Sequence, residues 1–416
     1  MKRCIRPVKQ GTAAFASLKR SRYPYIYPRD TCAICRAMKR VILHTHLREN
    51  LFRHMEGIAK FMLAIQRDDG YWGQRYDQDG TDKSIYVQED NVAMGILILV
   101  DYIITAHYLG RPIRNRDAYI KAIVKGMDYA LCKFYNPHNG LFRTTTAIHE
   151  SPIDTGYTIW ANYAYLHAMQ LLVELKTIGG IKMPARRYAS QAKQLEKRLK
   201  EKFIDRGRFI RRIRDDGSTD HSADIALISP FIFNCAYPDG TMLETIRYLR
   251  KNLWDPEFHL LCRYPERTDS NFETHHHGGY GPWLLYSAML ARLHYYYGNL
   301  AEGDIILKRI FSYATKKGYL AEHITTKARF LKFRKHQYET GLDFRKEFDP
   351  HILIPDVTPG LIEEEKRNMN RSYSRIMKRV MNDKRKTHAI KYVIPLTWTH
   401  AEVINAILEK MNYLTR

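Results

Sequence analysis

Two segments near the N-terminus combine carboxylates, arginine and aromatic residues at close spacing. The first runs from Tyr23 to Asp30 and reads Tyr-Pro-Tyr-Ile-Tyr-Pro-Arg-Asp; the second runs from Asp69 to Gly80 and contains Trp72. Binding a sugar requires donors and acceptors for its hydroxyls and flat aromatic faces for its C–H surface. These segments therefore predict a carbohydrate-binding pocket, although a helix cap with a surface ion pair would also account for Arg29 and Asp30.

Two further segments each place one glutamate beside apolar residues. Glu150 follows Ala-Ile-His, and Glu322 lies in Gly-Tyr-Leu-Ala-Glu-His. Burial penalises the charged form of a carboxyl group and raises its pKa, so either glutamate could donate a proton near neutral pH. A single glutamate is usually a surface residue, but glycoside hydrolysis needs two carboxyl groups placed across one bond. The pair is therefore the predicted catalytic centre.

Helices must position these residues, because apolar residues recur at intervals of three and four along most of the chain. Strand alternation is scarce, and about eleven to thirteen helices fit, each with its loop taking roughly 35 residues, as in an array of helix pairs. The expected helices are His44–Gln66, Val87–Tyr108, Tyr119–Tyr135, Thr155–Leu175, Ala189–Lys202, Thr241–Leu253, Trp283–Tyr297, Ala301–Lys316 and Thr399–Met411, with shorter ones at Asp30–Lys39 and Ser222–Asn234.

Long polar loops alternate with short connections, which favours a helical barrel that carries its long loops on one rim. These loops are Asp68–Gln88, Asn136–Asp154, Asp255–Pro282 and Gly318–Pro395. No linker divides residues 1–416, so we expect a single domain, with residues 325–394 forming an insertion on the rim.

Composition excludes several other classes of protein. The 416 residues are 45% hydrophobic and 12% aromatic, which excludes a disordered chain. The most apolar run, Ala93 to Val100, is shorter than the roughly 18–20 residues of a membrane-spanning helix. The N-terminus has no apolar signal region, and we expect a cytoplasmic protein. The net charge of +23 is spread along the chain, so nucleic-acid binding is the minority reading, with Lys378–Lys391 as its basic face.

No metal or cofactor is expected. The six cysteines include one isolated Cys-x-x-C pair, Cys32 and Cys35, with no second pair at zinc spacing. His275, His276 and His277 are consecutive, and three neighbouring side chains cannot easily converge on one ion.

Eight segments in chain order carry motifs that together resemble glycoside hydrolase family 15, the glucoamylase-like enzymes. They are Tyr23–Asp30, Asp69–Gly80, Gln88–Ala93, His149–Ser151, Arg263–Arg267, Gly278–Trp283, Gly318–His323 and Pro395–Glu402. The resemblance extends from about Gly11 to about Met411. It implies an all-α (α/α)6 barrel that acts as an inverting, exo-acting α-glucosidase and releases β-D-glucose without a metal or cofactor.

The resemblance also implies roles for individual residues. Glu150 would protonate the glycosidic oxygen, and Glu322 would activate a water on the opposite face of the sugar. The implied substrate-binding residues are Tyr23, Tyr27, Arg29, Asp30, Trp72, Arg263, Trp283 and Trp398. The partner would be an α-linked glucose oligosaccharide or polysaccharide.

The positions that depart from the family pattern include Tyr27, Asn91, which stands in place of an acid, His149, Ser151 and His323. Ser151 stands where the family has a glutamate on the aglycone side, which leaves open a trehalase or an α-1,6-glucosidase as alternatives. A carbohydrate-binding or regulatory protein without catalysis is a further alternative. For an inverting enzyme, the carboxyl groups of Glu150 and Glu322 should lie about 6.5–9.5 Å apart.

Overall fold

The computed structural model describes residues 3–19, 21–44, 48–150, 155–178, 181–263, 281–335, 339, 348–382 and 389–415. Ser151, the three consecutive histidines and most of the glycine-rich turn before Trp283 lie outside the described residues.

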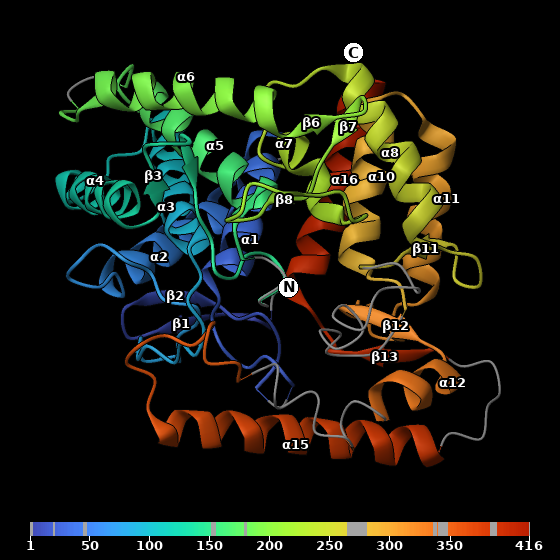
Figure 1. Cartoon of the computed structure of the whole chain (residues 1–416). Helices are drawn as coiled ribbons and strands as arrows, with labels where there is room; N and C mark the ends of the chain where they lie inside the picture. Colours follow the sequence, from blue (N-terminus) through green and yellow to red (C-terminus); the bar gives the residue numbers. More distant parts are fainter. Residues whose placement is uncertain are drawn as a thin grey trace.

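Two layers of helices wrap around a common axis (Figure 1). The inner layer contains α1 (Pro28–His44), α3 (Asp90–Tyr108), α5 (Ile159–Leu175), α7 (Ser229–Ile232), α10 (Leu284–Tyr296) and α16 (Thr397–Leu414). The outer layer contains α2 (Arg48–Ala64), α4 (Arg116–Lys133), α6 (Ala185–Lys202), α8 (Asp239–Leu253) and α11 (Leu300–Ser312). Helix α1 packs against both α3 and α16. The contact between α1 and α16 brings the first and last inner helices together and closes the ring. The fold is the predicted all-α (α/α)6 barrel.

The burial pattern of each helix explains its layer. In α10 every residue from Leu284 to Tyr295 is buried, as expected for a helix enclosed on all sides. In α6 the buried residues recur at helical spacing, and the charged residues face outward. Helix α3 is the one described helix apolar and long enough to cross a membrane, but 89% of its apolar window is buried, as in a core helix.

Most predicted helices are present with their ends shifted by a few residues. Helix α1 continues to His44, beyond the predicted end at Lys39. The predicted helix over Ser222–Asn234 is present only in part, because the segment forms the short helix η2 (Ile225–Ile228) followed directly by α7. Pro230 lies in the first turn of α7, and proline lacks the N–H that a continuous helix would need there.

Short antiparallel strands join the helices. β1 (Ile5–Val8) and β2 (Gly11–Ala14) form a hairpin in which Ile5 pairs with Ala14, and β2 packs on α2. A three-stranded sheet contains β5 (Tyr157–Thr158), β8 (Arg212–Ile213) and β9 (Thr219–Asp220). The remaining two-stranded pairs are β3 (Tyr135–Asn136) with β4 (Leu141–Phe142), β6 (Ile204–Asp205) with β7 (Arg208–Phe209), β10 (Trp254–Asp255) with β11 (Leu260–Leu261), and β12 (His323–Thr325) with β13 (Ile390–Tyr392).

The chain between β12 and β13 leaves the barrel and returns to the same place. It contains α12 (Lys327–Arg329), η3 (Phe330–Lys335) and the long helix α15 (Pro359–Asn382), which lies across one end of the barrel (Figure 1). Buried Glu365 of α15 forms ion pairs with Arg22 and Arg75, the latter at 2.9 Å. These contacts fasten α15 to the loops at the N-terminal ends of the inner helices.

Candidate active site

The start of α1 brings four predicted residues to the axis of the barrel. Pro28 occupies the first helical position, where its missing N–H would have no intrahelical partner. Arg29 and Asp30 follow in the first turn, and both are buried. Tyr23 and Tyr27 precede the helix with their rings in an edge-to-face contact at 6.0 Å between centroids.

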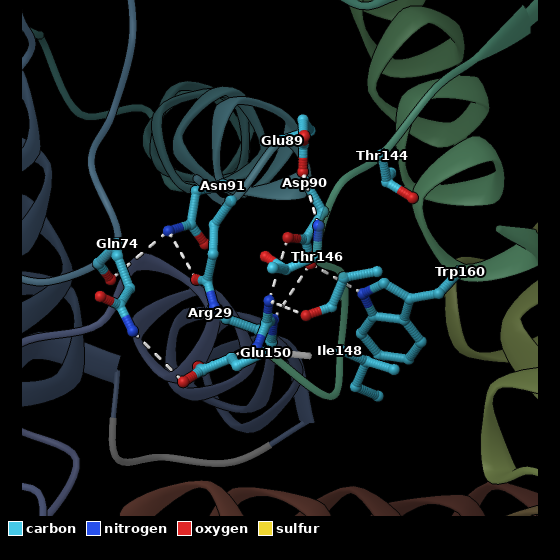
Figure 2. A network of polar contacts seen from close by, with 12 residues as sticks. Arg29, Gln74, Glu89, Asp90, Asn91, Thr144, Thr146, Ile148, Glu150 and Trp160 are labelled. Carbon is cyan, nitrogen blue, oxygen red and sulfur yellow. Dashed lines mark hydrogen bonds and ion pairs between the residues drawn. The ribbon is translucent and has the colours of Figure 1, made fainter. Parts of the chain in front are cut away.

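Asp90, the first residue of α3, holds Arg29 in place (Figure 2). The Nε and Nη2 atoms of Arg29 donate to the two carboxylate oxygens of Asp90, each at 3.0 Å, and Trp160 Nε1 donates to Asp90 Oδ2 at 3.0 Å. A bidentate arginine–carboxylate pair fixes both distance and orientation. Sequence reasoning did not place Asp90 among the site residues, although its segment, Gln88–Ala93, carried one of the motifs.

Glu150 lies beside Arg29 and is held by long hydrogen bonds. Its Oε1 accepts from Arg29 Nη1, and its Oε2 accepts from Gln74 Nε2, both at 3.3 Å. The side chain is 22% exposed. Its φ of +53° lies in the left-handed region, which is strained for a residue other than glycine and occurs most often at functional sites.

The loop before Glu150 is anchored to α3 by a buried carboxylate. Glu89 accepts hydrogen bonds from the backbone N–H groups of Thr145 and Thr146, at 2.6 and 3.3 Å. Burial raises the pKa of Glu89 to about 8, although these hydrogen bonds oppose the rise. On the opposite side, Gln74 Oε1 accepts from the N–H of Ile85 at 2.9 Å, which turns its amide N–H group toward Glu150.

His149 connects Arg263 to a buried aspartate. Arg263 Nε donates to His149 Nδ1 at 2.7 Å, and the Nε2 atom of the same ring contacts Asp224. Because arginine can only donate, the Nδ1 atom of His149 is the acceptor in this contact, and its Nε2 atom faces Asp224. Burial raises the pKa of the Asp224 carboxyl, but the neighbouring His149 ring and Arg211 outweigh it and hold the pKa well below its usual range. The Arg263 guanidinium lies 4.5 Å from the centre of the Trp283 ring.

Glu322 approaches from the other side of the barrel, at the base of the β12–β13 pair. Its backbone N–H is hydrogen-bonded to the carbonyl oxygens of Tyr392 and Val393, and its carbonyl accepts from the N–H of Leu284. The side chain is buried, and its Oε2 has no hydrogen-bond partner among the described residues. The β12–β13 pairing therefore places the Glu322 carboxyl at the start of α10.

These residues enclose one cavity of about 60 Å³ on the barrel axis. At roughly 10–15 Å³ for each water, the space holds about four to six waters, which suits one small ligand rather than a groove for a polymer. Seven of the eight predicted substrate-binding residues and both predicted catalytic glutamates line it. The lining residues are Ala16, Tyr23, Tyr27, Arg29, Asp30, Ile148, His149, Glu150, Arg263, Trp283, Leu285, Tyr286, Glu322, Leu396 and Trp398.

Three polar atoms of this lining are buried without a hydrogen-bond partner among the described residues. They are Asp30 Oδ1, Trp283 Nε1 and Glu322 Oε2. Buried polar groups are almost always paired, so an unpaired set around one cavity indicates a ligand with both donors and acceptors. Burial raises the pKa of Asp30 to about 8 despite the opposing charge of Arg29, and the carboxylates of Glu150 and Glu322 raise it further.

Trp72 is the predicted binding residue that does not reach the cavity, and its expected role is corrected here. Its side chain is fully buried, and its Nε1 donates to the carbonyl of Met62 at 2.9 Å. The indole fits against Gly95 and Gly126, where a Cβ atom would lie 2.5 and 2.7 Å from the ring. Trp72 therefore packs α3 against α4 in the core.

Among the described residues, no group of three or more histidine, cysteine, aspartate or glutamate side chains is placed to hold a metal ion. Cys32 and Cys35 are buried free thiols on α1.

Solved structures with distant sequences share this fold. A wild-type glycosidase is 16% identical with a TM-score of 0.60, over 97% of this chain and 92% of that chain. The glucoamylase from Saccharomycopsis fibuligera is 15% identical with a TM-score of 0.62, over 97% and 89%. A bacterial glucoamylase in complex with acarbose is 12% identical with a TM-score of 0.62, over 97% and 54%. No protein-family model matches the sequence, and no curated protein is significantly similar to it. The chain therefore has a glucoamylase-like fold.

Proposed function

We propose that this glucoamylase-like barrel is an inverting, exo-acting α-glucosidase that releases β-D-glucose from short α-linked glucosides. The observation that carries the proposal is the meeting of Glu150 and Glu322, from distant loops, at one cavity. The same cavity is lined by buried polar atoms that have no hydrogen-bond partner among the described residues. Neighbours of the fold include a glycosidase in complex with glucose and a glucoamylase in complex with acarbose. A pocket closed at its inner end accepts only the end of a sugar chain.

In this proposal Glu322 is the general base. Its buried Oε2 has no hydrogen-bond partner among the described residues, so it can accept a proton from a water that attacks the anomeric carbon. Glu150 is the general acid, and it protonates the glycosidic oxygen as the bond breaks. Its two hydrogen bonds of 3.3 Å are long for charge-assisted contacts, so the glycosidic oxygen can replace one of these donors.

The remaining lining residues bind and orient the terminal sugar. Asp30 Oδ1 accepts from a sugar hydroxyl, Trp283 Nε1 donates to one, and both then gain the partner that they otherwise lack. Arg29, held by Asp90, supplies a fixed positive charge beside Glu150. Arg263 is held by its hydrogen bond to His149, the residue next to Glu150.

Helix α15 favours short substrates in this proposal. Its Glu365 pairs with Arg22 and Arg75. Arg22 lies over the ring of Tyr23, which lines the cavity, and Arg75 lies over the ring of Tyr25. Helix α15 therefore reaches the cavity wall through one intervening side chain, that of Arg22. A helix fastened there leaves less room for a long aglycone.

A glucose-release assay on maltose, isomaltose, trehalose, dextran and starch tests the activity. We expect release from a disaccharide to exceed release from starch, and Glu322→Gln to lose turnover while it still binds the sugar. Glu150→Gln should lose activity on natural glycosides but retain activity on α-glucosyl fluoride, whose leaving group needs no protonation. If wild type and both variants all fail to release glucose from every substrate, the result would favour the carbohydrate-binding alternative.

A further inference from the structure

A second and larger cavity lies inside the barrel behind the sugar pocket. Its volume is about 530 Å³, within the range of small-molecule sites. Arg29 and Trp398 line both cavities and form the floor between them. The second cavity follows α1 from Arg29 to Arg40, toward the opposite end of the barrel. Glu174 and Asn234, which are exposed, mark its mouth.

Cations from two inner helices gather on the wall of this cavity. Arg36, Lys39 and Arg40 lie on one side of α1, and Arg292 extends from α10. Lys39 is neutralised by Asp101 at 2.7 Å. Arg40 and Arg292 share one carboxylate, that of Glu409, at 2.9 and 3.2 Å. A single carboxylate therefore compensates two guanidinium groups.

Arg36 has no such partner. Among the described residues it forms no hydrogen bond or ion pair, and its guanidinium lies 5.7 Å from the centre of the Phe233 ring. Nearby, the ring nitrogens of His167 likewise have no hydrogen-bond partner among these residues, although the side chain is only 8% exposed. An unpaired cation in a partly enclosed space is unfavourable unless a ligand compensates it.

The remaining buried carboxylate of the wall is already occupied by hydrogen bonds. Glu402 accepts from Trp398 Nε1 at 3.0 Å and from Asn405 Nδ2 at 3.4 Å. Among the described residues, Glu402 forms no ion pair with Arg36. The lining contains five cations, of which Arg29 is paired with Asp90 outside the cavity wall. It contains four carboxylates, of which three are buried and Glu174 is exposed, and Arg36 is left to a ligand.

The pKa values of two residues in the wall, Arg40 and His167, agree with an excess of positive charge. Burial, together with the charges of Arg292 and Arg36, lowers the pKa of Arg40 to about 10 despite its pairing with Glu409. Burial and the charges of Arg36 and Lys39 lower the pKa of His167 well below its usual range, so its ring is neutral. An anion in the cavity would relieve this repulsion.

We propose that this second cavity binds a small phosphorylated compound, such as a phosphate ester of monosaccharide size. The planar guanidinium of Arg36 matches the geometry of phosphate oxygens, and neutral His167 can donate to one of them. The amides of Gln170 and Asn234 line the remaining space and can bind hydroxyl groups. The volume is larger than inorganic phosphate alone requires.

Isothermal titration calorimetry at matched ionic strength tests the proposal, with inorganic phosphate, a hexose 6-phosphate and neutral glucose as probes. We expect the hexose phosphate to bind with one-to-one stoichiometry and more tightly than inorganic phosphate. Arg36→Gln should weaken hexose phosphate binding by about tenfold to a hundredfold, the effect of losing a charged hydrogen-bond partner. Gln170→Glu, nearly equal in size, places a repelling carboxylate in the wall and should weaken binding as well.

Two controls separate this site from other sources of binding. Arg247→Gln removes an equally charged residue that is 71% exposed, so it reports non-specific attraction to the basic surface and should leave binding unchanged. Glu322→Gln disables the sugar pocket and should also leave it unchanged, so the test does not depend on hydrolase activity. No phosphate or hexose phosphate binding by wild type, or equal binding by wild type, Arg36→Gln and Gln170→Glu, would overturn the proposal.

Discussion

Replacing Asp90 by asparagine removes the charge that holds Arg29 and changes little else. Asp90 is fully buried and accepts three hydrogen bonds of 3.0 Å, two from Arg29 and one from Trp160. Arg29 is only 5% exposed, so water cannot replace the lost carboxylate. The variant therefore leaves a guanidinium buried with an incomplete set of acceptors.

The size of the effect follows from the environment of Arg29. Removing one partner of a buried ion pair costs about 3–5 kcal/mol. Glu150 remains at 3.3 Å as a second counter-charge, which favours the lower end, about 3 kcal/mol. Arg29 should also turn toward Glu150 and occupy its carboxylate, so we expect kcat to fall together with the free energy of unfolding.

Urea unfolding at 25 °C, followed by tryptophan fluorescence, measures the loss for Asp90→Asn. The matched control is Asp128→Asn, which removes one partner of an exposed pair with Arg187, where 46% and 51% of the side chains are accessible. The control should change the free energy of unfolding by less than about 1 kcal/mol. A change in Asp90→Asn no larger than that of the control would refute the role of Asp90.

Three other variants test separate parts of the structure. The Asp30 pKa of about 8 means that the folded protein keeps a proton that the unfolded chain loses near pH 4, so the free energy of unfolding should fall between pH 4 and 8. In Asp30→Asn this free energy, measured by urea unfolding at pH 5 and pH 9, should fall less than in wild type. Glu365→Gln should destabilise the attachment of α15 and raise kcat/KM on maltoheptaose relative to maltose. Gly95→Ala should force the Trp72 ring aside, cost about 1–3 kcal/mol and leave KM unchanged.

Each of these expectations has an outcome that contradicts it. An equal pH dependence in Asp30→Asn and wild type would remove Asp30 from the proton balance of folding. An unchanged substrate ratio in Glu365→Gln would show that α15 does not limit the aglycone. A higher KM in Gly95→Ala, with stability retained, would return Trp72 to the binding site.

The sequence allowed much of the barrel to be predicted, because helix periodicity depends on local residue types. The inner helix α10 and the outer helix α6 were both expected within a few residues of their observed ends. The helix predicted over Ser222–Asn234 was longer than the observed η2 and α7, because Pro230 and tertiary packing limit the segment rather than the apolar pattern around it. The β1–β2 hairpin was also missed, since its strands have only four residues each.

The site was predicted in composition but not in its internal contacts. Aromatic and acidic motifs identified most of the cavity lining, yet Trp72 has the same local signal as the true lining residues and lies in the core. The partners that fix the site, Asp90 for Arg29 and Asp224 for His149, are distant in sequence. Such pairings depend on how the helices assemble, which residue spacing alone does not contain.

The anomeric form of the first glucose released from maltose tests the proposed roles of Glu150 and Glu322 most directly. Carboxyl groups about 6.5–9.5 Å apart leave room for a water between base and sugar, whereas a separation of about 5 Å allows direct attack by a carboxylate. Proton NMR during the first turnovers distinguishes the two. We predict β-D-glucose, formed by inversion. α-D-glucose as the first product would contradict the inverting mechanism and the role of Glu322 as the base that activates water.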